Sequence, residues 1–326
     1  MNQAEVERIL EVPDGSFIDP RIYFSPEIYE TELRHVLPRS WVLVADLQDL
    51  REPGDFVTDT IGTEPVIVVR SSDGELRAFS NVCTHRGCLL AEGTGNCGPG
   101  LACPYHGWTF KNDGRLSGVS FRKDFGSALD TDSLDLHSLP VAIWQRWVFV
   151  NVSADAGPLT EWLEDVPLLT RGHGFSSAIR VAERDDEVAC NWKVLVDNGA
   201  CDYHYWFVHA QTLGPAIDPG ALEVDNGDTT ATMYAEYKGA SGFRPLEFLS
   251  ARERSGSFVF SIFPNLLILA FPNGSCWLLR WTPLSIDRTR ARVWIYSRDA
   301  DEDPRGSEVL LERVQREDYA TCERVQ

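Results

Sequence analysis

The sequence predicts an α+β protein with two domains, an all-β module followed by a larger domain in which an antiparallel sheet packs against helices. Short β-branched runs separated by turn residues fill the stretch from Trp41 to Val152. Beyond residue 156, helical and strand periodicities are mixed, which is typical of a sheet covered by helices. The chain has 326 residues, 43% of them hydrophobic, and this is enough for two cores.

Residues 1–40 are expected to form a helical lead-in that packs on the second domain. In residues 27–37 the apolar side chains recur at helical spacing, and Pro38 ends the pattern. We therefore place the three parts of the chain at 1–40, 41–155 and 156–326.

Two hairpins are predicted in the all-β module. Residues 65–81 alternate apolar and polar side chains around Asp73-Gly74, and a second strand pair surrounds Asp113-Gly114. An Asp-Gly pair between alternating runs is a strong hairpin signal. Residues 142–152 are rich in β-branched and aromatic side chains and are expected to form one further strand.

The second domain alternates helical and extended patterns. Residues 162–171 have a helical period, residues 180–198 are expected to run from a strand into a helix, and residues 304–326 have a helical period again. The apolar runs expected to form the sheet are 229–237, 257–264, 266–272, 276–284 and 290–298.

Composition narrows the class of protein. The net charge of −19 argues against nucleic acid or an anionic membrane as the main partner. No apolar stretch approaches the roughly 20 residues of a membrane span, and the N-terminus does not resemble a signal peptide. A cytoplasmic protein is therefore expected, in which the eight cysteines are thiols or metal ligands rather than disulfides.

The first group of candidate ligands is Cys83, His85, Cys103 and His106, within CTHRG and CPYHGW. Each Cys–His pair is followed by a glycine and lies at a predicted turn, so two hairpin tips can converge on one site. A zinc ion could use the same four ligands. A Rieske centre places two thiolates on one iron and two imidazoles on the other, and the asymmetric spacing in a β context favours this [2Fe–2S] cluster.

The second group contains His204 and His209. On an ideal helix their rings would diverge by roughly 140°, so they can share a metal only if the helix widens or ends between them. Two histidines and one carboxylate form the facial triad of non-haem Fe(II) oxygenases, which keeps positions open for O2. The carboxylate must come from elsewhere, and Glu317 and Asp318 are both available.

CTHRG and CPYHGWTF, with the flanking residues 53–70 and 114–119, resemble the Rieske motif of ring-hydroxylating and related Rieske non-haem iron oxygenases. Residues 191–193 (NWK), Asp197-Asn198 and the two histidines are similar to the catalytic helix of that family. FPN (263–265) is similar to its catalytic sheet. The resemblance covers nearly the whole chain and implies a catalytic α subunit with a helix-grip catalytic domain.

The resemblance also implies site residues. It selects Asp318 as the iron carboxylate, with Glu317 in reserve, and it places Asn198 among the catalytic residues. The family usually carries an acid three residues before the first iron histidine, where it bridges the two metal centres. Cys201 occupies that position here, so we assign the bridge to Asp202, with Asp197 or a water as alternatives.

The implied function is an oxygenase component. It would use O2 and electrons from NAD(P)H, delivered by a ferredoxin or flavin reductase, to mono- or dihydroxylate or oxidatively demethylate a small aromatic substrate. A head-to-tail homotrimer, α3 or α3β3, is implied as well. The alternatives are an electron-transfer Rieske protein without oxygenase activity and a quaternary-ammonium monooxygenase of the same family.

Two further features bear on that function. Four basic residues follow the second cluster motif and would suit an acidic electron donor: Lys111, Arg115, Arg122 and Lys123. The chain stops at Gln326, whereas the last helix of the family normally continues, which leaves Asp318 about two helical turns from the end.

Overall fold

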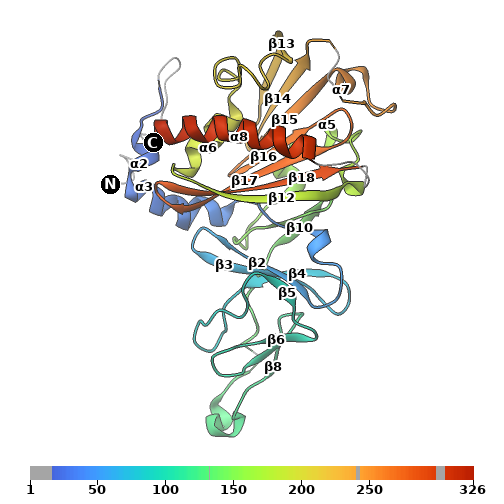
Figure 1. Cartoon of the computed structure of the whole chain (residues 1–326). Coiled ribbons are helices and arrows are strands. Elements are labelled where there is room, and N and C mark those ends of the chain that lie inside the picture. Colours follow the sequence, from blue (N-terminus) through green and yellow to red (C-terminus); the bar gives the residue numbers. More distant parts are fainter. Residues whose placement is uncertain (1–16, 132, 240–242, 299–304) are drawn as a thin grey trace. The chain divides into compact units, whose positions relative to one another are not determined.

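The computed structural model of the chain describes residues 17–131, 133–239, 243–298 and 305–326 (Figure 1). The chain divides into two compact units, Leu33–Leu159 and the combination of Met1–Glu32 with Thr160–Gln326. The predicted boundaries lay at 40/41 and 155/156. Part of the predicted lead-in, residues 1–16, lies outside the described residues. Within the described ranges, no helix has both the length and the hydrophobicity needed to cross a bilayer.

The smaller unit is built from three antiparallel sheets, with strand orders β1-β11-β10, β5-β2-β3-β4-β9 and β6-β7-β8. It also contains three short 3-10 helices: η2 (Leu37–Arg39) precedes the first strand, and η3 (Leu47–Asp49) and η4 (Arg122–Ala128) connect strands. Its strands are β1 (Val42–Asp46), β2 (Asp55–Ile61), β3 (Glu64–Arg70), β4 (Leu76–Ser80), β5 (Thr94–Asn96), β6 (Gly100–Ala102), β7 (Thr109–Lys111), β8 (Leu116–Gly118), β9 (Ser138–Leu139), β10 (Val141–Trp144) and β11 (Trp147–Val150).

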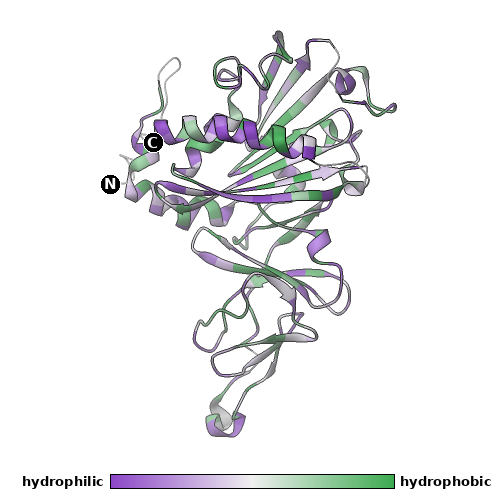
Figure 2. Ribbon diagram, viewed as in Figure 1, coloured by the Kyte–Doolittle hydropathy of each residue, from purple (hydrophilic) through white to green (hydrophobic). Residues whose placement is uncertain are grey.

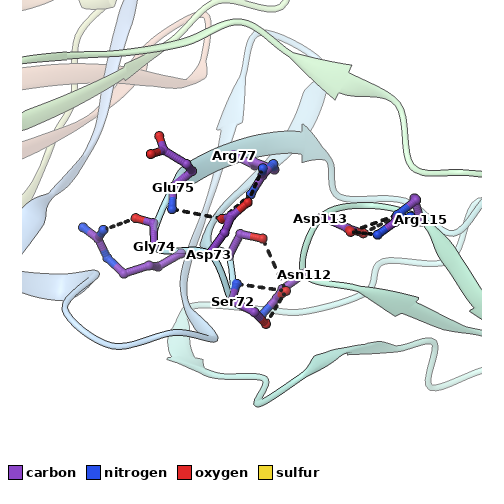
Figure 3. Close-up of polar contacts among 10 residues, drawn as sticks. Ser72, Asp73, Gly74, Glu75, Arg77, Asn112, Asp113 and Arg115 are labelled. Atoms are coloured by element: carbon purple, nitrogen blue, oxygen red, sulfur yellow. Dashed lines mark hydrogen bonds and ion pairs between the residues drawn. The ribbon is translucent and has the colours of Figure 1, made fainter.

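Both predicted hairpins are confirmed. The turn at Asp73-Gly74 joins β3 to β4, and the turn at Asp113-Gly114 joins β7 to β8. Figure 3 shows how side chains hold the turns: the Asp73 carboxylate accepts hydrogen bonds from Arg77, and Asn112 Oδ1 accepts from the Ser72 hydroxyl at 3.1 Å. Asn112 therefore ties one hairpin turn to the other within this unit.

The prediction of one strand over residues 142–152 is wrong. The chain turns at Gln145, which has a φ of 60°, and β10 and β11 pair with each other as a hairpin. Arg146, in the turn, makes a buried ion pair with Asp46 at 2.7 Å. That ion pair fixes the turn within a run whose side chains alone favour a continuous strand.

The larger unit contains one antiparallel sheet of seven strands in the order β12-β18-β17-β16-β15-β14-β13. Its strands are β12 (Ile179–Val188), β13 (Ile217–Asn226), β14 (Thr230–Tyr237), β15 (Gly256–Ile262), β16 (Leu266–Ala270), β17 (Cys276–Ser285) and β18 (Arg288–Ser297). Its helices are α2 (Arg21–Phe24), α3 (Pro26–Thr31), α4 (Leu159–Trp162, across the unit boundary), α5 (Val166–Leu169), the 3-10 helix η5 (Phe175–Ser177), α6 (Trp192–Ala200), α7 (Ala251–Ser255) and α8 (Arg305–Val325). The π-helical segment η1 (Glu32–Val36) crosses the boundary between the units.

The two long helices, α6 and α8, cover one face of this sheet (Figure 1). The strands contribute alternate side chains to the core beneath them, among them Val259, Leu267 and Trp277. Figure 2 shows hydrophobic and hydrophilic residues alternating along α8, and its buried residues include Leu311 and Val314. The amphipathic period of α8 therefore explains why it lies against the sheet.

Helix α6 begins and ends at identifiable residues. The Asn191 side chain caps its first turn by accepting from the Lys193 amide at 3.1 Å. The N-terminal segment anchors the helix from outside: Glu32 accepts from the Lys193 ammonium at 2.7 Å, and the Tyr23 hydroxyl donates to Asp197. The helix ends at Ala200, before both predicted iron histidines.

We expect Gly114→Ala to destabilise the smaller unit by about 3 kcal/mol. Gly114 has a φ of +89°, and a Cβ there would lie 2.4 Å from the Phe79 ring, so strain adds to overlap. Gly74→Ala is the matched control, because it shares the positive φ but has open space around it, and should cost about 1 kcal/mol. Native-state hydrogen exchange of the buried β3 amides measures both; equal losses would contradict the packing argument.

Candidate metal centres

The two Cys–His loops of the smaller unit are built alike. The Cys83 carbonyl accepts from the Gly87 amide and the Cys103 carbonyl accepts from the Gly107 amide, each at 2.9 Å. Both glycines have a positive φ, 69° and 67°, a conformation that favours glycine. The glycine four residues after each cysteine therefore lets the chain turn tightly around that cysteine.

Backbone amides point at both sulfurs. The N–H groups of the second and third residues after each cysteine donate to its Sγ. Burial raises the pKa of the Cys83 thiol. Burial alone would also raise that of Cys103, but the amides of Tyr105 and His106 lower the pKa of this thiol overall. Such donors stabilise a thiolate ligand and, in iron–sulfur proteins, raise the reduction potential.

The two imidazoles lie close to each other. The His85 and His106 ring centroids are 4.8 Å apart, and Trp108 stacks on His85 at 4.6 Å. The Nδ1 atom of His106 is buried and has no hydrogen-bond partner within the described ranges. A buried ring nitrogen without a partner is expected where a metal is bound. The two sulfurs contact each other and the two imidazoles lie side by side, a pairing that fits a cluster with two thiolates on one iron and two imidazoles on the other.

The alternative of a single zinc ion fits less well. A zinc tetrahedron needs its four ligand atoms within about 4 Å of one another. Among the residues that the structure describes, only His204, His209 and Asp318 bring three possible ligand atoms within 4.8 Å. A two-iron cluster spreads its ligands over two metals, so the wider spacing of Cys83, His85, Cys103 and His106 favours it.

The second centre lies in the larger unit, between α6 and α8. The His209 Nε2 atom is 3.0 Å from Asp318 Oδ1, and the His204 Nε2 atom is 3.4 Å from the same oxygen. Two imidazole nitrogens and one carboxylate oxygen thus converge, and this donor set fits a non-haem Fe(II) ion with open positions.

The local backbone explains how the two histidines meet. Residues 203–214 form a series of turns after α6 rather than a continued helix, and the carbonyl of His204 accepts from the amides of both Phe207 and Val208. The 140° divergence of an ideal helix therefore does not arise.

Asn198 orients the carboxylate of Asp318. Its side-chain amide donates to Asp318 Oδ1 at 2.9 Å. Burial would raise the pKa of Asp318, but hydrogen bonds from His204, His209 and Asn198 lower it overall. Burial likewise would lower the pKa of His209, but Asp318 and Glu317 raise it. The carboxylate is thus ionised at neutral pH, as a metal ligand must be.

Glu317 contacts the other nitrogen of His209. Its Oε2 atom lies 2.8 Å from His209 Nδ1 and accepts from the Thr212 hydroxyl at 2.6 Å. Because an ionised carboxylate only accepts, Nδ1 carries a proton and donates it to Glu317, and Nε2, which donates to Asp318 here, is the nitrogen that would bind a metal after losing its proton. The sequence offered Glu317 as a reserve ligand; its role as partner of His209, and that of Thr212, were not predicted.

The candidates for the bridging acid differ in their surroundings. Asp197 accepts from Tyr23, and Cys201, in the position of the usual acid, is exposed. Asp202 is half-buried, and its carbonyl accepts from the Tyr205 amide. His204 Nδ1 is buried with no partner in the described part of the chain. One hydrogen-bonding position on the first histidine is thus available to a bridging group.

A small, largely apolar pocket of about 40 Å³ adjoins the three converging side chains. Its walls come from alternate residues of the sheet and from α8: Val259, Leu267, Leu269, Trp277, Leu279 and Leu311. Phe258 and Phe260 stack on each other on the opposite face of β15 from Val259, because neighbouring strand residues point to opposite faces.

Comparisons with known proteins agree with this arrangement. Residues 40–129 match the family model described as the Rieske [2Fe-2S] domain. Residues 175–326 match the model described as the ring hydroxylating alpha subunit, catalytic domain. The fold and the two centres define a two-domain metalloprotein, and the chain belongs to the α subunits of the Rieske oxygenases. Their cofactors are a [2Fe–2S] cluster and a mononuclear iron.

Curated relatives include both mono- and dioxygenases. The carnitine monooxygenase oxygenase subunit of Acinetobacter baumannii is 32% identical over 59% of this chain and 52% of that protein. Choline monooxygenase of Beta vulgaris is 28% identical over 96% and 71%. The chlorobenzene dioxygenase subunit alpha of Cupriavidus sp. is 31% identical over 62% and 46%. The chain thus spans about half the length of two of these relatives.

Solved structures support the same fold. An apo quaternary ammonium Rieske monooxygenase superimposes with a TM-score of 0.77 at 26% identity, covering 94% of this chain and 83% of that one. Naphthalene 1,2-dioxygenase with indole bound superimposes with a TM-score of 0.78 at 26% identity, covering 94% and 79%.

Glu317→Ala should weaken binding of the mononuclear iron by about 10- to 100-fold, because His209 loses the acceptor that fixes its ring. Glu317→Gln keeps an acceptor oxygen and should lose less. The control is Glu312→Ala, since Glu312 pairs with Arg316 on the same helix. Iron titration with cluster content as an internal reference measures the effect; equal affinities in Glu317→Ala and the control would contradict this role.

Proposed function

We propose that this chain is the oxygenase component of a Rieske system, which hydroxylates or oxidatively demethylates a small organic substrate. The convergence of His204, His209 and Asp318 on one point carries this proposal. An electron-transfer Rieske protein has no use for a second site with open metal positions.

The proposed cluster ligands are Cys83, His85, Cys103 and His106, and the proposed iron ligands are His204, His209 and Asp318. When bound, the iron would activate O2 with electrons that arrive through the cluster. The donor set at each centre supports this assignment, with two buried thiols and two imidazoles at one and two imidazoles and a carboxylate at the other.

The surrounding residues of this chain would position those ligands. Glu317 and Thr212 hold His209 in one tautomer, and Asn198 directs one oxygen of Asp318 toward both histidines. The aliphatic pocket wall excludes water from the face on which substrate would lie. These side chains therefore hold the ligands in position before any substrate binds, and such preorganisation lowers the cost of reaching the reactive geometry.

The substrate is proposed to carry an apolar or aromatic body. The pocket combines leucine and valine side chains with Trp277, a lining that suits a hydrocarbon ring. An aromatic face also suits a quaternary ammonium group. The relatives named above include enzymes for carnitine, choline and chlorobenzene, so their names support both kinds of substrate.

The electron donor is proposed to be a ferredoxin or a flavin reductase supplied with electrons from NAD(P)H. Two of the four basic residues after the second cluster loop already have partners within the chain, so fewer are available to bind an acidic electron donor. Arg115 pairs with Asp113 at 2.6 Å, and Arg122 donates to the carbonyls of Gly126 and Leu129. We also propose a head-to-tail homotrimer, in which the cluster of one subunit serves the iron of its neighbour.

His204→Ala should remove the mononuclear iron and leave the cluster intact. The variant lacks one of three iron ligands, while the cluster residues lie in a different unit of the chain. Iron quantification with EPR of the reduced cluster measures both centres, and His137→Ala, at an exposed histidine, is the control. Unchanged iron content in His204→Ala would overturn the proposed site, and a colourless wild-type protein would exclude the cluster.

We propose Asp202 as the bridging acid, so Asp202→Asn should leave both metals bound and slow electron transfer from the cluster to the iron by about 10- to 100-fold. The control is Cys201→Ser at the adjacent exposed position. Stopped-flow reoxidation of the pre-reduced cluster by O2 reports the rate. Wild-type kinetics in Asp202→Asn would assign the bridge to another group.

A further inference from the structure

A second cavity lies beside the metal pocket in the larger unit. It has a volume of about 250 Å³ and is enclosed by the edge of the sheet and by the first half of α8. Strands β12 and β18 contribute Ala182, Val293 and Ile295 to an aliphatic floor, and α8 contributes Glu308 and Glu312. We call it the outer cavity. It reaches solvent, because the Glu312 side chain on its rim is 42% exposed.

Leu311 and Gln315 line both the outer cavity and the metal pocket. Helical geometry explains the sharing. Residues 308, 311, 312 and 315 recur at the spacing of one helix face, and residues 311, 314, 315 and 318 recur in the same way on the adjoining face. Leu311 and Gln315 belong to both sets, so these two side chains alone from α8 separate the cavities.

Leu311 and Gln315 thus form a partition between the metal pocket and the outer cavity. The sizes of these two spaces show why the partition matters for a substrate. The metal pocket, at about 40 Å³, has room for about one water molecule. Sites for small organic ligands usually measure at least about 300 Å³. A substrate therefore needs more space than the metal pocket offers, and displacement of the partition would join it to the 250 Å³ of the outer cavity.

The two residues of the partition are held differently. Gln315 is 1% exposed, and it donates to the Tyr319 hydroxyl at 2.6 Å while accepting from Arg184. Arg184 is itself fixed by Asp186 at 2.8 Å. Leu311 is aliphatic and so makes no hydrogen bond, and it borders a cavity on each side into which its side chain could turn. Leu311 is thus the movable part and Gln315 the fixed part.

We propose that the outer cavity is the entry for substrate, and that Leu311 controls passage from it to the iron. This inference rests on the proposed function, because it assumes iron at His204, His209 and Asp318. The lining combines an aliphatic floor with three carboxylates and the guanidinium of Arg184, and two of those carboxylates also pair with arginines outside the lining, Glu183 with Arg180 and Glu312 with Arg316. Glu308 adds a third carboxylate beside these pairs. The entry therefore takes a small organic molecule without negative charge, and it disfavours anions.

The test measures how fast a chelator reaches the iron, so no substrate needs to be known. Reduced wild-type protein is mixed anaerobically with 2,2′-bipyridine, which is neutral, and the EPR signal of the iron–nitric oxide adduct reports the iron remaining. We expect Leu311→Trp to slow iron removal about tenfold and Leu311→Ala to accelerate it about tenfold. Val309→Trp, at a position that is 65% exposed on the same helix, should leave the rate unchanged.

The sign of the Leu311→Trp effect separates passage from misfolding. Overpacking that loosens α8 would release iron faster, whereas a blocked passage releases it more slowly. Equal rates in wild type, Leu311→Trp and Leu311→Ala would overturn the proposal. Absence of the adduct signal in the wild type would instead overturn the proposed iron site, so the two failures are distinguishable.

A second chelator tests the charge of the entry. Ferrozine, which carries sulfonates, should remove iron more slowly than bipyridine from the wild type. The double variant Glu308→Gln/Glu312→Gln should raise the ferrozine rate several-fold and leave the bipyridine rate unchanged. An unchanged ferrozine rate would overturn the discrimination against anions.

Discussion

The packing of α8 against α6 is the interaction on which the catalytic unit depends. It brings Asp318 to within 3.0 Å of the Nε2 atom of His209, a residue that follows a helix formed more than a hundred positions earlier in the chain. The Asn198 amide, from α6, donates to the same carboxylate oxygen. The seven-stranded sheet supports both helices, so its apolar face positions the carboxylate as well as the pocket wall.

Adjacent acids on α8 have different tasks because successive helix residues point about 100° apart. Asp318 faces the converging Nε2 atoms, and Glu317 faces the Nδ1 atom of His209. A short carboxylate on the metal side and a longer one behind the histidine fix the ring from two directions. One helix thus supplies a candidate ligand and the group that sets the tautomer of another.

Local features were the most predictable from the sequence. The cluster residues lie in two short turns whose glycines and spacing are visible in the sequence, and the two Asp-Gly hairpins followed from turn chemistry. The pairing of Asp318 with the histidines is not visible in any periodicity, and only the resemblance to a family suggested it. The role of Glu317 depends on how α8 is rotated about its axis, which the helical period alone does not determine. Strand β13 was missed because Pro219 and Gly220 interrupt its pattern, and the structure accommodates them at a register shift.

The positions of the candidate ligands along the chain determine the order in which the two sites become complete during synthesis. The four cluster residues lie between positions 83 and 106, so a nascent chain carries the complete set once the second loop has been made. The other centre joins His209 to residues of α8, among them Glu317, which lies 108 positions later in the sequence. During synthesis, therefore, the two histidines exist without their carboxylate until the last strand of the sheet and most of α8 have been translated. The residues proposed to hold the cluster are therefore all present in the nascent chain well before the carboxylate that completes the proposed iron site.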